Sequence, residues 1–203
     1  MKYWGFLFSM LLSTPAIADS SIPVTPLNQN LAVVDYFDDG RQTGCGLRAT
    51  GETKDNLWLN VLITVFIKET GSTFGVIKVV ARKVKTRDGV PLLREGKITY
   101  TNLGKIQKAW IRSDSGKEPL IYKNDESSHS DAYMVSAEFA STVDLLVAMV
   151  QGNFRVGLNR NAQDPDEVFQ FNKPLDKNEG EKLSVCMKNL RTQMEDNKDK
   201  QNF

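Results

Sequence analysis

The chain has 203 residues, of which 40% are hydrophobic and 25% are charged. These values are ordinary for a soluble globular protein, and the length suits one domain with a substantial core. The formal net charge of +1 excludes a general electrostatic affinity for nucleic acid or anionic membranes, because such affinity needs an excess of positive charge.

The N-terminal residues have the pattern of an export signal. Lys2 supplies a positive charge, the apolar run Tyr3–Leu12 follows, and Ala16 and Ala18 form a small-x-small cleavage site. We therefore expect a signal peptide at residues 1–18 that is cleaved near Ala18, with an uncleaved anchor as the alternative. The mature chain should contain no transmembrane segment. Such a signal is typical of export to the periplasm of a Gram-negative bacterium, and a eukaryotic secreted protein is the alternative source.

Residues 19–30 contain two prolines and no periodicity, which predicts an extended lead-in. Strands should follow at residues 31–38 and 43–50. The clearest pattern lies in Leu57–Lys68, where every odd position is apolar from Leu57 to Ile67. This period of two predicts a central strand with one buried face, and even positions such as Thr64 should be more tolerant of substitution.

A turn at Gly71 leads from this strand into a second long strand, Phe74–Arg87. The remaining strands are expected at residues 97–101, 105–113, 118–123 (an edge strand), 132–138, 154–160 and 168–172. Helical spacing predicts a helix over residues 139–151, with Ser141 or Thr142 as its N-cap and Gly152 as its stop.

A closing helix should begin near Asp176, which has the spacing of a capping box with Glu179. Its apolar stripe contains Cys186, so this face should pack against the body of the protein. Cys45 and Cys186 are the only two cysteines. In an oxidising compartment two cysteines commonly pair, which predicts a disulfide bond that encloses most of the mature chain. A nucleophilic thiol is the alternative, and it would need a histidine partner.

These elements predict a mainly β (α+β) fold, either a twisted antiparallel sheet or a β-sandwich. Two helices should pack on one side of it, with the last helix at the C-terminus. We expect a single β-rich domain over residues 31–195 and a disordered tail over residues 196–203. A strict α/β fold is disfavoured, because helices do not alternate with strands.

Positive charge is concentrated between Lys78 and Arg112. This segment contains ten basic and two acidic residues, which gives it a net charge of +8. The candidate binding residues are Lys83, Lys85 and Arg87 on the second long strand and Lys108, Trp110 and Arg112 on a later one. A basic surface with an aromatic side chain can bind an acidic protein or another anionic macromolecule. The alternative is a solvated sheet face, or an edge that lysines protect from aggregation.

Other chemistry has little support in the sequence. His129 stands in Ser-Ser-His-Ser-Asp, but catalytic triads draw their members from separate parts of a chain, so a solvated loop is favoured. Acidic residues cluster without the spacing of a calcium loop, at Asp35, Asp38 and Asp39 and at Asp164, Asp166 and Glu167. One histidine and two paired cysteines make no zinc site. We therefore expect no catalytic residue, no metal and no cofactor.

The sequence thus predicts an exported, non-enzymatic binding or accessory protein of an envelope or secretion assembly, or an inhibitor. Its partner should be an acidic protein or another anionic macromolecule of the envelope, bound through the basic sheet surface. The alternative is a small periplasmic hydrolase that uses His129 and nearby carboxylates.

Overall fold

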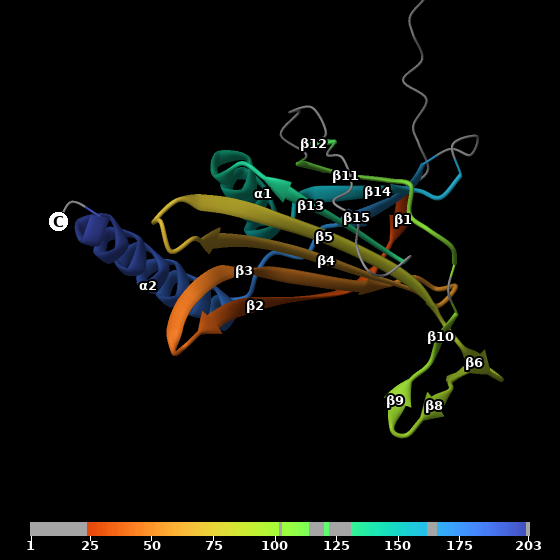
Figure 1. Cartoon of the computed structure of the whole chain (residues 1–203). Helices are drawn as coiled ribbons and strands as arrows, with labels where there is room; N and C mark the ends of the chain where they lie inside the picture. Colours follow the sequence, from red (N-terminus) through yellow and green to blue (C-terminus); the bar gives the residue numbers. More distant parts are fainter. Residues whose placement is uncertain (1–23, 102, 114–119, 122–130, 162–165, 202–203) are drawn as a thin grey trace, which may run out of the picture.

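The computed structural model describes residues 24–101, 103–113, 120–121, 131–161 and 166–201. These residues form two main β-sheets, a projecting pair of short hairpins and two helices (Figure 1). The expected mainly β fold, with an antiparallel sheet and the last helix at the C-terminus, is confirmed.

The large sheet has the strand order β10-β5-β4-β3-β2, with β13 beside the first half of β5 and β10 beside its end. Its strands are β2 (Asn28–Asp38), β3 (Arg41–Glu52), β4 (Leu57–Ile67), β5 (Thr73–Val84), β10 (Tyr100–Thr101) and β13 (Ala132–Ala137). All its pairings are antiparallel, and β2 to β5 follow one another as hairpins. The predicted central hairpin therefore exists, although its second strand ends at Val84 rather than at Arg87.

The small sheet packs against the large one and has the order β1-β15-β14-β11-β12. Its strands are β1 (Val24–Pro26), β11 (Lys108–Ser113), β12 (Leu120–Ile121), β14 (Phe154–Asn159) and β15 (Glu167–Phe171). β1 runs parallel to β15, and the other pairings are antiparallel. β1 and the first residues of β2 fall within residues 19–30, so both sheets begin inside the expected lead-in.

The core lies on one face of the large sheet, the face that carries the odd positions of β4. Leu59, Val61, Ile63 and Val65 are all 0% exposed there. The two helices and the small sheet cover this face, and each fully buried aliphatic side chain contributes roughly 1.5–3 kcal/mol. The even face is mostly half-buried, but Thr64 is also 0% exposed. Thr64 therefore departs from the expected half-exposed face, and the expectation that its substitution is milder than that of Ile63 stays a prediction.

Helix α1 (Phe139–Gln151) has the bounds that its helical spacing predicts, and it ends at Gly152 with φ 68°. Its N-cap is Glu138, whose side chain makes no cap hydrogen bond, so the expected cap at Ser141 or Thr142 is wrong. Thr142 is instead buried, and its hydroxyl donates to the Glu138 carbonyl oxygen at 2.8 Å. It packs against Gly75 of β5, where a Cβ atom would lie 1.7 Å from Thr142 Oγ1.

Helix α2 (Lys177–Gln201) crosses β3 and β2 at the other side of the covered face. The carboxylate of Asp176 accepts a hydrogen bond from the Glu179 backbone N–H at 3.0 Å, which confirms the expected start of this helix. The predicted disulfide bond joins Cys45 of β3 to Cys186 of α2, with 5.9 Å between the two Cα atoms.

Helix α2 continues to Gln201, into the stretch expected to be a disordered tail. In the part of the chain that the structure describes, neither helix combines the length and apolar content needed to cross a bilayer.

The side chain of Glu179 covers part of the open edge of β2. Its Oε2 accepts a hydrogen bond from the backbone N–H of Val33 at 2.6 Å, and its Oε1 accepts one from Lys182 Nζ at 2.5 Å. The hydrogen bond from Lys182, followed by the one from Val33, holds the pKa of Glu179 below its usual value of 4.5. A capped edge strand is also protected from pairing with other chains.

We expect Glu179→Ala to lower the free energy of unfolding by about 1 kcal/mol at pH 7, a hydrogen-bond value reduced for solvent screening. Because the folded-state pKa is depressed, this stabilisation is present above the unfolded-state pKa and is lost as the pH falls through the folded one. Urea unfolding at pH 7 and near pH 3 should therefore show a difference that shrinks in acid. Glu181→Ala, at an exposed position of the same helix, is the control; a pH-independent deficit in Glu179→Ala would contradict the assignment.

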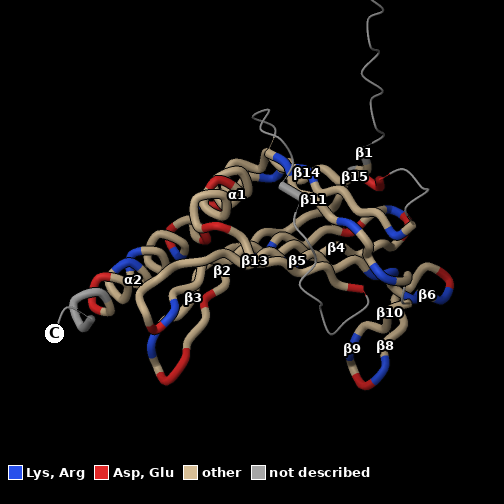
Figure 2. Tube along the Cα trace, turned by 45° about the horizontal axis from the view of Figure 1, so that its top comes forward, with Lys and Arg blue, Asp and Glu red and all other residues tan. Residues whose placement is uncertain are grey.

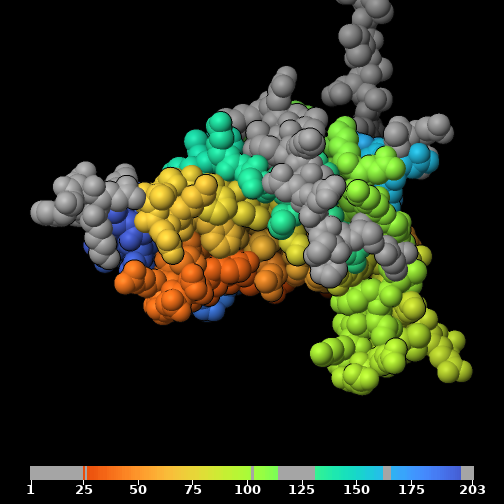
Figure 3. All heavy atoms as spheres, in the orientation of Figure 1, coloured from red at the N-terminus to blue at the C-terminus, as the bar shows by residue number. Residues whose placement is uncertain are grey.

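The chain between β5 and β10 forms a projection that we call the arm, residues 85–99. It consists of two hairpins, β6 (Thr86–Arg87) with β7 (Val90–Pro91) and β8 (Leu93–Arg94) with β9 (Lys97–Ile98). Both turns place two residues at positive φ, with 54° and 79° at Asp88-Gly89 and 54° and 74° at Glu95-Gly96. This is the geometry of type I′ hairpin turns. The arm stands away from the body of the protein (Figures 1 and 3).

Candidate binding surface

The outward face of β11 carries three of the predicted binding residues, Lys108, Trp110 and Arg112, because alternate residues of a strand share a face. Trp110 Nε1 donates a hydrogen bond to Asp166 Oδ2 at 2.7 Å, and Lys108 Nζ lies 3.7 Å from the same oxygen. The indole ring lies against Gly157 of β14, where a Cβ atom would come within 1.9 Å of it. Trp110 is therefore fixed in place, and part of the Lys108 charge is compensated by Asp166.

Arg155 of β14 adds a cation that the sequence analysis missed. It pairs directly with Arg112 across the sheet, and its Nε donates to Gln170 Oε1 of β15 at 2.7 Å. Both arginines are exposed. The alternation within β14 already places Arg155 opposite its buried neighbours, but only the register of β14 against β11 brings it beside Arg112.

The other three predicted residues do not lie on the small sheet but at the end of β5 and on the arm. Lys83 is the one exposed residue of β5 and lies opposite Thr101 of β10, while Lys85 and Arg87 are exposed residues of the arm. The structure therefore divides the predicted surface into two groups, one on the small sheet and one at the arm, rather than placing it on a single sheet face. Figure 2 shows Lys and Arg along the arm and along the segment that leads from it to β11.

We call these two groups together the basic end: Lys83, Lys85, Arg87, Lys108, Trp110 and Arg112. Arg82, which directly precedes Lys83 in the sequence, makes different contacts. Its guanidinium forms an ion pair with Asp131 and lies over the ring of Tyr100, 5.6 Å from the ring centroid. Within the described residues no ion pair involves Lys83, Lys85, Arg87 or Arg112. Their charges are available to an outside partner.

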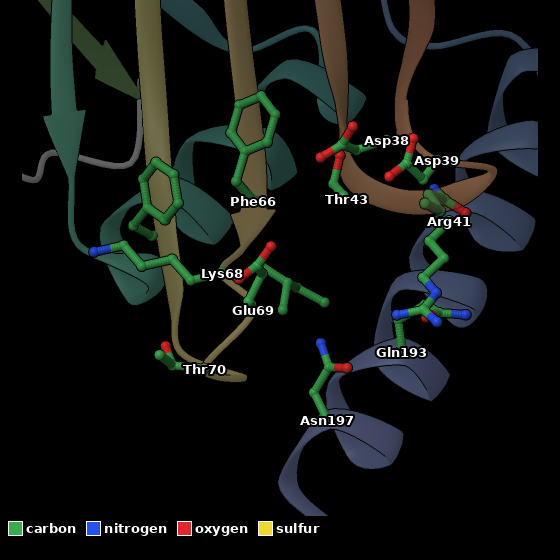
Figure 4. A pocket seen from close by; sticks show the side chains of 13 residues that line it. Asp38, Asp39, Arg41, Thr43, Phe66, Lys68, Glu69, Thr70, Gln193 and Asn197 are labelled. Atoms are coloured by element: carbon green, nitrogen blue, oxygen red, sulfur yellow. The ribbon is translucent and has the colours of Figure 1, made fainter. Parts of the chain in front are cut away.

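A polar cleft of about 870 Å³ opens at the end of the large sheet farthest from the arm. Figure 4 shows it between the β2–β3 turn, the β4–β5 turn and the C-terminal half of α2, with Arg41 extended towards Gln193. Charged side chains of both signs line it, namely Asp38, Asp39, Arg41, Lys68 and Glu69. Three acidic and two basic side chains leave a net charge of only −1, so charge alone gives the cleft little selectivity for anions or cations.

Most acidic residues that the sequence suggested as metal ligands serve other contacts or lie apart. Asp166 accepts from Trp110 and also from Asn159 Nδ2 at 3.1 Å. Asp38 and Asp39 line the cleft, whereas Asp166 directly precedes β15 of the small sheet. No group of three His, Cys, Asp or Glu residues within the described part of the chain could hold a metal ion. His129 and Asp164 lie outside the described residues, so the hydrolase alternative stays a prediction.

Comparison of the chain with protein-family models, with curated proteins and with solved structures gives no match. Function is therefore inferred from the surfaces of this chain.

Proposed function

We propose that this chain is an exported, non-enzymatic binding protein whose basic end binds an anionic macromolecule. The observation that carries the proposal is the segregation of charge. The segment from Lys78 to Arg112 has a net charge of +8, whereas the whole chain has a net charge of +1. The remaining residues therefore have a net charge of −7. An envelope or secretion assembly, or an enzyme that the protein inhibits, would supply such a partner.

Export is supported by two independent features. The N-terminal sequence has the order of charge, apolar run and small residues that export signals share. The Cys45–Cys186 bond is a type of cross-link that persists in oxidising compartments and is rare in the cytosol.

The basic end has the physical properties of an electrostatic docking surface. Its charged side chains are exposed, and Trp110 lies among them, fixed by Asp166 and Gly157. A local excess of positive charge raises the rate of encounter with anionic partners and disfavours basic ones. Because exposed charges are screened beyond roughly 8–10 Å at physiological salt, binding should weaken as salt is raised.

The test is reversal of Lys83, Lys85 and Arg87 to glutamate. We expect the variant to fold normally, since solvent-exposed substitutions usually change stability by less than about 0.5 kcal/mol. Affinity capture from intact cells, quantified by mass spectrometry, should recover the partner with wild-type protein at about 50 mM salt, and much less at about 300 mM. The triple variant should recover little at either salt concentration.

The matched control is reversal of Lys173, Lys177 and Lys188, three exposed lysines on or next to α2. It changes the net charge by the same amount, so it should retain the partner if position rather than total charge decides binding. Capture at wild-type strength by the arm variant, across the whole salt range, would show that the basic end is only a solvated surface.

A further inference from the structure

The arm exposes apolar side chains that no other described element covers. Val90 is 65% exposed, Leu93 63%, Ile98 45% and Leu92 40%. The other large hydrophobic residues with comparable exposure are scattered over β2 and the helices, at Phe37, Phe139, Val147 and Val185. Scattered exposed apolar residues need no explanation, but a group of them on one short projection indicates an interaction site.

Basic residues alternate with the apolar residues along these hairpins; Arg94 and Lys97, for example, form the cross-strand pair next to Leu93 and Ile98. Lys85, Arg87, Arg94 and Lys97 are exposed on the same two hairpins, and the only acidic residues among them are Asp88 and Glu95 in the turns. Lysine and arginine can lay their methylene chains along apolar material while the charged group stays in water. Exposed apolar side chains with basic residues next to them in the same hairpins match the boundary between lipid headgroups and acyl chains.

The arm is also held in one conformation at its base. The Lys85 N–H donates to the Thr99 carbonyl at 2.9 Å, the Leu92 N–H to the Lys85 carbonyl at 2.8 Å, and the Thr99 N–H to the Leu92 carbonyl at 2.9 Å. The Thr99 hydroxyl also donates to the Leu92 carbonyl, at 2.9 Å. These bonds join the two hairpins, so the apolar side chains are presented without the entropy cost of ordering a loop on binding.

Resting on the proposed function, we propose that the anionic partner of the arm is a lipid bilayer containing anionic phospholipid, into which Val90 and Leu93 insert. The composition of the arm favours lipid over protein. The apolar residues of the arm are aliphatic, and residues 85–98 contain no aromatic side chain, whereas protein-binding hot spots are enriched in Trp and Tyr and poor in Leu and Val. The arm is a projection rather than a pocket (Figure 3), which suits contact with a flat surface.

The charge distribution reconciles this proposal with the low net charge of the chain. The arm itself carries four basic and two acidic residues, a net charge of +2, within the Lys78–Arg112 segment of +8, and the residues outside that segment carry −7. An anionic surface therefore attracts this segment, with the arm projecting from it, and repels the remaining residues. The bilayer would therefore bind the protein in one orientation, with the arm towards the lipid.

The experiment is flotation of the exported protein with unilamellar vesicles of phosphatidylcholine alone and of phosphatidylcholine with one quarter phosphatidylglycerol. We expect binding to the anionic vesicles only, reduced by raising the salt from about 50 to about 300 mM. The double variant Val90→Ser and Leu93→Ser should bind at least about tenfold less, because the apolar contribution of both side chains is removed while every charge remains.

Val185→Ser is the control, since Val185 of α2 is 60% exposed, much like Leu93; it should bind as wild type does. Thermal melting of each variant checks that the fold is intact. Absence of binding to the anionic vesicles, equal binding to both vesicle types, or undiminished binding by the Val90 and Leu93 variant would each overturn the lipid proposal. If the vesicles do not bind while cellular capture still depends on Lys83, Lys85 and Arg87, the partner is an acidic protein and only the proposed function stands.

Discussion

Ile63→Asp should destabilise the domain by more than about 4 kcal/mol, which would leave most of the protein unfolded. Ile63 is 0% exposed and lies at the centre of β4, paired with Leu47 of β3 and Ile77 of β5. Both neighbours are buried hydrocarbon side chains, so the new carboxylate would have neither water nor a hydrogen-bond donor. Far-ultraviolet circular dichroism and urea unfolding of the purified variant measure the effect.

Two controls separate burial from substitution as such. Ile63→Val keeps the side chain apolar and should cost only about 0.5–1.5 kcal/mol. Arg48→Glu, at an exposed position of the neighbouring strand on the opposite sheet face, should change stability by less than about 0.5 kcal/mol. If Ile63→Asp unfolds at the wild-type urea concentration with an unchanged slope, the odd face of β4 is not the core.

Removal of the Cys45–Cys186 bond should be the second most damaging change. Cys45→Ala and Cys186→Ala should each lower the free energy of unfolding by about 2–5 kcal/mol, because the bond closes a long loop in the unfolded chain. The two cysteines are 141 residues apart, and both are buried, at 0% and 6% exposure. Denaturant unfolding of each variant, with and without a reducing agent, gives the size of the effect.

The double variant provides the internal check, since each single substitution breaks the same bond. It should be little less stable than either single variant, and reduction should affect wild type alone. Fully additive losses would mean that the two residues act separately. Two titratable thiols in folded protein isolated from the export compartment would show that the bond does not form there.

Elements with strong local patterns could be predicted from the sequence. The unbroken alternation from Leu57 to Ile67 gave β4 because one face is buried along its whole length. The helical spacing before Gly152 correctly predicted α1, and the pair of cysteines correctly predicted the contact between α2 and β3. In each case a single physical constraint, periodic burial or a covalent bond, acts on residues that are visible together in the sequence.

Features that depend on distant pairing could not be predicted. The strand-like sequence of Phe74–Val84 is followed directly by Lys85, Thr86 and Arg87. Nothing in the local sequence shows that β5 ends at Val84 and that the arm begins there. Val24–Pro26 is a strand only because β15 offers it an edge. The N-cap of α1 was misplaced because Thr142, a good capping residue, is needed against Gly75 instead.

The candidate surface also combines features that are visible in the sequence with features that depend on distant pairing. The basic residue types were evident from the sequence, but their grouping was not, because Arg155 reaches Arg112 only through the register of two strands far apart in the chain. An apolar residue such as Leu93 predicts burial when it is considered alone. Its exposure follows from the turn at Glu95-Gly96, which folds the arm back on itself away from the core.

The pairing of β1 with β15 has a consequence for the order in which the chain folds. β2 to β5 are joined by short turns and can assemble as soon as they are synthesised. Val24 can pair only after Val168 has been synthesised, and β3 can be covered only after α2, which carries Cys186, has been synthesised. Such long-range contacts form slowly, because the loop between them must close first. A chain that is threaded through a membrane channel from its N-terminus would therefore remain incompletely folded until its last segment has passed.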